Sequence, residues 1–148
     1  QLALGGERGA GFAESLRTSL RVLGRFLEAN RALVGRILAD ALNGETVARD
    51  FLRDNLPRHV RAILGLVKAG QAAGELRAMD PTQAFAFCAG ALAMPILIGG
   101  AVAESGALDA GFASQLQGAV LTDEALDERI DLAIAAIAAG PGRRKGVR

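Results

Sequence analysis

The chain has 148 residues, and its 17 Lys and Arg against 16 Asp and Glu give a net charge of +1. This near balance excludes a domain that binds polyanions through its overall charge. The length is enough for one domain with its own hydrophobic core. Ala, Leu, Gly and Arg dominate, and aromatic residues make up only 4% of the chain. This composition predicts an all-α fold, and the helical patterns along the chain predict a bundle of about five to six helices.

The two ends differ from the middle. Residues 1–11 are rich in Gly and have no apolar period, so we expect a linker or a disordered end there. Residues 12–140 are expected to form one helical domain, and the basic stretch 141–148 a disordered tail. Residues 1–11 lack the regions of a signal peptide, and the chain has a single cysteine, so we expect a cytoplasmic protein. The first residue is not Met, so we expect a processed or shortened chain.

Apolar residues recur every three or four positions from Phe12 to Leu27, which predicts an amphipathic helix to about Ala29. Arginines at positions 17, 21 and 25 fall on its other side and are interpreted as solvated surface. A second, shorter helix follows to Leu42, where Asn43 and Gly44 stop it.

The third helical pattern runs from near Glu45 to about Ala73, with Pro57 inside it. A proline removes a backbone hydrogen bond and crowds the preceding turn, so the pattern is either one kinked helix or two helices. After residue 104, a short helix is expected within 105–121. Thr122 is a good cap for a last helix over 123–139.

The segment 81–104 is the centre of the chain. Asp80 and Pro81 start a helix that carries no charge from Ala84 to Ala103, a length that can cross a bilayer. Its Ala and Gly content and the absence of Trp and Tyr favour the core of a soluble protein. A soluble helix that is apolar all round must be covered on every side. We therefore predict that its own domain covers one side and a second copy the other, with membrane association as an alternative.

His59 and Cys88 are the only histidine and the only cysteine, which argues against a zinc site. The chain has no convincing strand for a Ser, His and acid triad, and its Gly-rich stretches lack the Lys and Ser or Thr of a phosphate loop. We predict no catalytic residue, no metal site and no cofactor, and we do not expect an enzyme. His59 and Asn55, one turn apart, are interpreted as either pocket wall or solvated surface.

Residues 64–84, LGLVKAGQAAGELRAMDPTQA, are similar to the C-terminal half of tetracycline-repressor (TetR) family regulators. In that family a helix often ends in a Gly-x-x-x-Gly-Glu-Leu-Arg turn, and an Asp-Pro cap starts the next helix. The predicted helix order over residues 12–140 also resembles the family. The resemblance implies a homodimeric transcriptional repressor with an N-terminal helix-turn-helix domain. Its C-terminal domain would sense a small, mostly apolar effector and form the dimer through a four-helix bundle.

By position, the resemblance implies a ligand pocket among the first four helices. The predicted pocket residues are Phe26, Leu33, Ile37, Phe51, Asn55, His59, Ile63, Phe85, Cys88 and Met94. It implies a dimer interface on the helix 81–104 and on the last helix. The predicted interface residues are Ala91, Pro95, Ile98, Val102, Leu126, Ile130, Ile134 and Ile137. Which side of the helix 81–104 meets the partner is left open, because its periodicity is flat.

The stretch before Phe12 is too short for a helix-turn-helix. The resemblance therefore implies that operator DNA is contacted only through an N-terminal domain that is not in this chain. Two other function classes stay open: a helical module that only mediates protein association, and a membrane-associated helical protein.

Overall fold

The computed structural model describes residues 11–140, and in this range it is all-α. Seven α-helical segments and one π-helical turn follow each other: α1 Phe12–Ala29, α2 Arg31–Leu42, α3 Thr46–Ala72, α4 Pro81–Met94, η1 Pro95–Gly99, α5 Gly100–Glu104, α6 Ala110–Val120 and α7 Asp123–Ile137. Since α4, η1 and α5 are continuous and form one long helix, the bundle has six helices in the described range, as predicted. The predicted tail, and all of the predicted linker except Gly11, lie outside the described residues.

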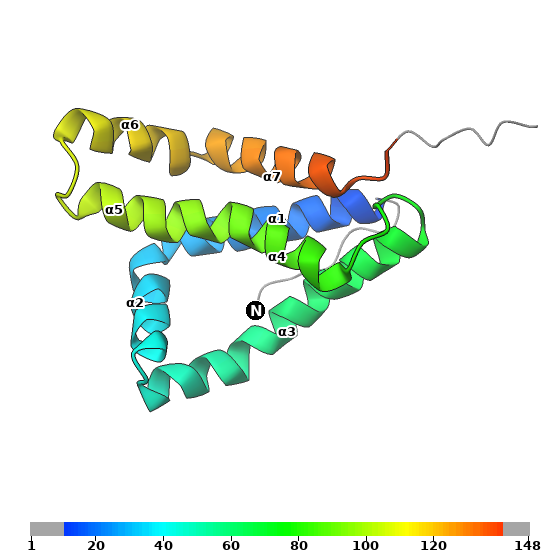
Figure 1. Ribbon diagram of the computed structural model, residues 1–148, viewed down its shortest axis with the longest axis horizontal. Helices are drawn as coiled ribbons and strands as arrows, with labels where there is room; N and C mark the ends of the chain where they lie inside the picture. The colour runs from blue at the N-terminus through cyan, green and yellow to red at the C-terminus, as the bar shows by residue number, and fades with distance from the viewer. Residues whose placement is uncertain (1–10, 141–148) are drawn as a thin grey trace, which may run out of the picture.

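The helices form two layers (Figure 1). The long helix Pro81–Glu104 lies beside α6 and α7, which run back antiparallel to it, and α1 packs behind this pair. α2 turns away at one end of the bundle, and α3 returns diagonally to meet α1 and α4 near its own C-terminus. The arrangement places the first three helices around one side of the molecule and the last helices on the other.

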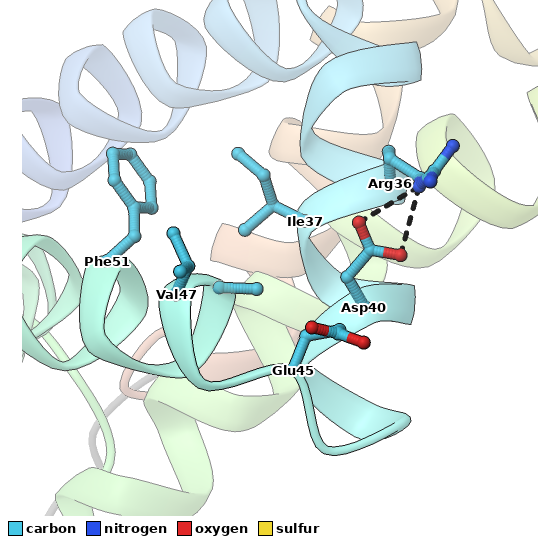
Figure 2. Close-up of a pocket in the computed structure, with 7 residues that line it drawn as sticks. Arg36, Ile37, Asp40, Glu45, Val47 and Phe51 are labelled. Carbon is cyan, nitrogen blue, oxygen red and sulfur yellow. Dashed lines mark hydrogen bonds and ion pairs between the residues drawn. The ribbon is translucent and has the colours of Figure 1, made fainter.

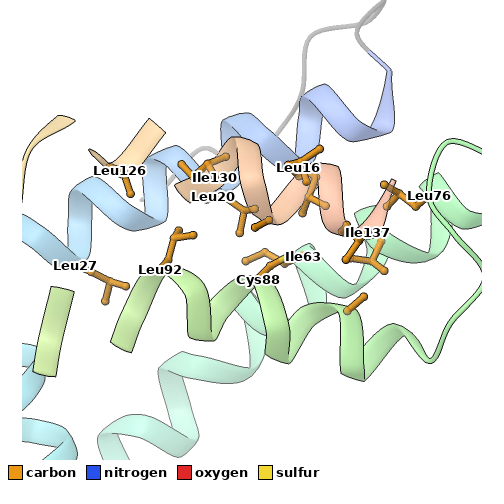
Figure 3. Packing of buried hydrophobic residues seen from close by; sticks show 14 of the residues in the cluster. Leu16, Leu20, Leu27, Ile63, Leu76, Cys88, Leu92, Leu126, Ile130 and Ile137 are labelled. Carbon is orange, nitrogen blue, oxygen red and sulfur yellow. The ribbon is translucent and has the colours of Figure 1, made fainter. Parts of the chain in front are cut away.

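The hydrophobic core lies where α1, α3, the long helix and α7 meet (Figure 3). The long helix contributes buried residues at every fourth position, which is close to one residue per turn. The fully buried large side chains are Leu16, Leu20, Ile63, Val67, Cys88, Leu92, Ile96, Leu126 and Ile130. α2 has no buried residue, and α3 has buried residues only from Ile63 onward. The core therefore runs along α1 and α7 and leaves out α2 and the first half of α3.

The two prolines inside helices have different outcomes. α3 passes through Pro57 as a single helix, so the prediction of one helix rather than two is the correct alternative. Pro95 instead begins the π-helical turn, in which the Gly100 N–H donates to the carbonyl of Pro95 five residues earlier. A proline crowds the turn before it, and local rewinding is one way in which a helix accommodates it.

The arginines of α1 are not simply solvated, which corrects the sequence interpretation. Arg17 pairs with Asp131 of α7, Arg21 Nε lies 2.6 Å from Asp127 Oδ1, and Arg25 Nη2 lies 3.2 Å from Asp123 Oδ2. The pairs follow one another every fourth residue along two antiparallel helices. Each is partly exposed and contributes little, about 0.2–1 kcal/mol, but together they fix the register of α1 against α7.

The predicted caps of the long helix and of α7 are present in the structure. The Asp80 carboxylate accepts from the Thr82 and Gln83 N–H groups at 2.8 and 3.0 Å, and Pro81 follows it at the first helical position. Thr122 Oγ1 accepts from the Ala125 N–H at 3.2 Å. These bonds satisfy backbone donors that a helix start leaves free, which explains why the sequence predicts both starts.

Leu126→Ala should lower the free energy of unfolding by about 2–5 kcal/mol, because it leaves a cavity where α7 meets α1 and the long helix. The matched control is Leu42→Ala, since Leu42 at the end of α2 is 86% exposed. That change should stay within about 0.5 kcal/mol. Urea denaturation followed by circular dichroism measures both, and equal effects would contradict the placement of the core.

Candidate functional site

The long helix carries a second apolar stripe on the side that its own subunit leaves uncovered. Phe87, Met94, Ile98 and Val102 are 39–58% exposed. They follow one another at steps of seven and four residues, which are two turns and one turn of a helix, so they lie along one side. No charged residue occurs between Ala84 and Ala103. The stripe is therefore both apolar and uncharged.

The neighbouring helices border this stripe, and α7 carries a large exposed apolar residue of its own. A side chain at Gly99, next to Ile98, would lie 3.6 Å from Val120 Cγ1 of α6, so this side of the long helix borders α6. On α7, Leu132 is exposed and lies about 140° around the helix from Asp127, which faces α1. Leu132 therefore points away from α1. We call the surface of Phe87, Met94, Ile98, Val102 and Leu132 the outer face.

The structure divides the predicted interface residues. Ile98 and Val102 lie on the outer face, and Ala91 and Pro95 are half-buried beside it. The four residues on α7 are corrected: Leu126, Ile130, Ile134 and Ile137 are buried in the core of their own subunit. They have no surface left for a partner. Phe87 and Leu132 are not among the predicted residues, because their exposure becomes visible only once the phase of each helix is known.

The same helix has the properties of a membrane span by length and composition. Pro81–Glu104 has a mean hydropathy of 2.1 over its most apolar window, and 22% of that window is buried inside the subunit. It is the one such helix among the described residues. The core helix of a soluble protein passes the same test.

A second candidate site lies between α2 and the first turns of α3 (Figure 2). Ile37 of α2 and Val47 and Phe51 of α3 point into one space. We call this space the hollow; its lining residues are Arg36, Ile37, Asp40, Glu45, Val47, Ala48 and Phe51. Arg36 forms an ion pair with Asp40 at 2.9 Å on its rim. The hollow is open to solvent and combines an apolar floor with a charged edge.

The hollow brings together only two of the predicted pocket residues, Ile37 and Phe51. Leu33 lines a different shallow depression beside Arg31 and Glu104, and Phe26 is exposed near the end of α1. Met94 belongs to the outer face. The other predicted pocket residues are the polar pair Asn55 and His59 and three residues near the core. The latter are Ile63, Phe85 and Cys88.

The polar pair lies on α3 beyond the hollow. The Asn55 side chain donates to the Phe51 carbonyl of its own helix at 2.8 Å, a bond typical of a helix surface. His59 Nε2 accepts from Arg58 Nε at 3.3 Å. Neither side chain lines the hollow, so the surface interpretation of these two residues describes their positions better.

Ile63 and Cys88 are fully buried in the packed core, and Phe85 packs partly buried against it. The structure places Ile63 and Cys88 away from the hollow, so their role in ligand binding stays a prediction. Burial also raises the pKa of the Cys88 thiol to about 11. The thiol therefore stays protonated and unreactive at neutral pH.

Among residues 11–140, no group of three or more His, Cys, Asp or Glu side chains is placed to hold a metal ion. The described part of the chain thus offers two apolar surfaces, the outer face and the hollow. Both could bind a partner or a ligand through apolar side chains.

The buried thiol gives a pH dependence with a defined sign. The pKa of Cys88 is raised on folding, so its contribution to stability is complete below about pH 9 and is lost as the pH rises towards 11. The wild-type chain should lose up to about 3 kcal/mol more than Cys88→Ala over this range. Urea titrations at pH 7, 9 and 10.5 measure the difference. Parallel curves for the two proteins would show that the thiol is not buried.

The comparisons with known proteins add no relative: the chain matches no protein-family model, no curated protein and no solved structure.

Proposed function

We propose that this chain is the effector-sensing and dimerisation domain of a TetR-like transcriptional regulator. Support comes from the stretch 64–84, which resembles that family, and from the order of the six helices. The observation that carries the proposal is the outer face, because the family resemblance implies a partner at the long helix and the last helix. An upstream DNA-binding domain belongs to the proposal.

The outer face calls for a cover. Large apolar side chains that form a contiguous exposed surface mark an interaction site in a soluble protein. In a dimer with a two-fold axis, the same surface of each copy packs against that of the other, so both outer faces are buried together. In this arrangement the long helix and α7 of one copy pack against the same two helices of the other, as a four-helix bundle.

The hollow is the proposed place for the effector. Its apolar floor of Ile37, Val47 and Phe51 suits a small apolar or aromatic molecule, and the charged rim suits a polar group at one end. The effector acts by binding one arrangement of α2 and α3 better than another. It can shift the equilibrium by no more than this difference in affinity.

One observation favours a second candidate, a module that only mediates protein association. The hollow is open and lined by few apolar residues, whereas a ligand site usually encloses most of its ligand. The two candidates share the outer face and differ in whether the hollow binds a small molecule.

Ile98→Glu should convert a dimer into a monomer, because the new carboxylate would be buried without a partner in the interface. Ile98 is 53% exposed in the single chain, so the change is tolerated by the subunit itself. The control is Leu42→Glu, which adds the same charge to an exposed apolar position on α2, off the outer face. Sedimentation equilibrium at micromolar concentration in detergent-free buffer measures the mass.

The dimer proposal fails if the wild-type chain sediments as a monomer in that buffer, or if Ile98→Glu keeps the dimer mass. A wild-type chain that is soluble only in detergent would instead favour lipid as the cover of the outer face.

Phe51→Ala should weaken the binding of a small apolar probe by about tenfold, because the ring supplies much of the floor of the hollow. The probe is N-phenyl-1-naphthylamine, and its fluorescence on titration gives the dissociation constant. Phe112→Ala is the matched control, since Phe51 and Phe112 are both 51% exposed and only Phe51 lines the hollow. Equal losses in both variants, or no binding to the wild type, would favour the association module.

A further inference from the structure

The start of α1 is held by the side chain of Glu75, which lies in the turn that follows α3. Gly11 precedes the helix and has no side chain to cap it. The Ala13 N–H instead donates to Glu75 Oε2 at 2.9 Å, and the two residues are 62 positions apart in the chain. A carboxylate at a helix start satisfies a free N–H group and interacts favourably with the helix dipole. Glu75 therefore serves as the cap that the local sequence lacks.

The same turn is fixed to the end of α7. The Ala139 N–H donates to the Glu75 carbonyl at 2.9 Å, and the Arg77 N–H donates to the Ile137 carbonyl at 2.9 Å. Leu76 between them is buried against the core. The turn is also tied to α3, since the N–H groups of Glu75 and Leu76 both donate to the Gly70 carbonyl. Residues 75–77 thus join the start of α1 to the ends of α3 and α7.

The Glu75 carboxylate also lies close to Gly11. A Cβ at Gly11 would lie 2.9 Å from Glu75 Oε2 and 3.3 Å from Glu75 Cδ. Gly11 has φ −61°, so alanine would be compatible with its backbone. A side chain at Gly11 would therefore require the end of the Glu75 side chain to move, without straining the backbone.

We propose that Glu75 is a positioning residue that latches the first turn of α1 to the ends of α3 and α7. The latch fixes the direction in which the chain enters α1 at Gly11. Movements of α7, which borders the outer face, are thereby passed to the start of α1 through two backbone bonds and one carboxylate. The use of this path to orient an upstream DNA-binding domain rests on the proposed function, but the latch itself does not.

Amide hydrogen exchange measured by NMR on the 148-residue chain tests the latch. Glu75→Ala removes the acceptor, and Gly11→Ala displaces it while keeping its charge. Both should speed exchange at the Ala13 amide by about tenfold relative to the Val67 amide, which lies in the core and serves as the internal reference. Glu75→Gln keeps an acceptor oxygen and should change the rate less than Glu75→Ala.

Glu14→Gln is the matched control. Glu14 also lies in the first turn of α1, but it pairs with Arg17 and does not cap the helix. It should change exchange at Ala13 by less than about threefold. Equal acceleration by Glu14→Gln and Glu75→Ala would overturn the latch, because the effect would then be one of charge alone. Unchanged exchange in both Glu75→Ala and Gly11→Ala would overturn it as well.

A general loss of stability is distinguishable from the loss of the latch. If exchange at Val67 rises as much as at Ala13, the variants unfold the whole subunit and the latch is overturned. The sedimentation mass of Glu75→Ala should equal that of the wild type, whatever that mass is. A monomeric wild type with the expected exchange pattern would therefore contradict the proposed dimer and leave the latch standing.

Discussion

The structure depends on one constraint: the helix Pro81–Glu104 is apolar around its whole circumference, and its subunit covers only part of it. α1, α3 and α7 cover the inner side with Leu and Ile side chains, and this contact is the core. α2 and α6 border its C-terminal part, and only the side that carries Phe87, Met94, Ile98 and Val102 stays exposed within residues 11–140. Both the stability of the subunit and the proposal of a partner follow from how this one helix divides its surface.

The helix boundaries could be predicted because each is marked by local chemistry. Phe12 and Ala29 bound α1 as the apolar period indicates, and Asp80 and Thr122 cap the helices that follow them. Caps act within three residues, so they can be identified without knowledge of the tertiary structure. The all-α class follows from the same local signals.

The assignment of surfaces could not be predicted from the same patterns. Leu126, Ile130, Ile134 and Ile137 form a seam that looks the same whether it meets its own subunit or a second copy, and the structure shows that it meets its own. The charges of α1 did carry a usable signal. Arginines and aspartates repeat every fourth residue on two helices, and this shared spacing indicates that the two rows can pair.

The π-helical turn has a consequence for how the long helix tolerates changes in length. In a regular α-helix, residues four positions apart differ by about 40° in direction. The buried residues at every fourth position from Ala84 to Gly100 would therefore turn gradually around the helix axis. The wider turn at Pro95–Gly99 takes back part of this drift, and the row stays buried to its end. Deleting a single residue from this turn would restore the regular pitch. It would rotate α5 against α6 while leaving the segment apolar and uncharged.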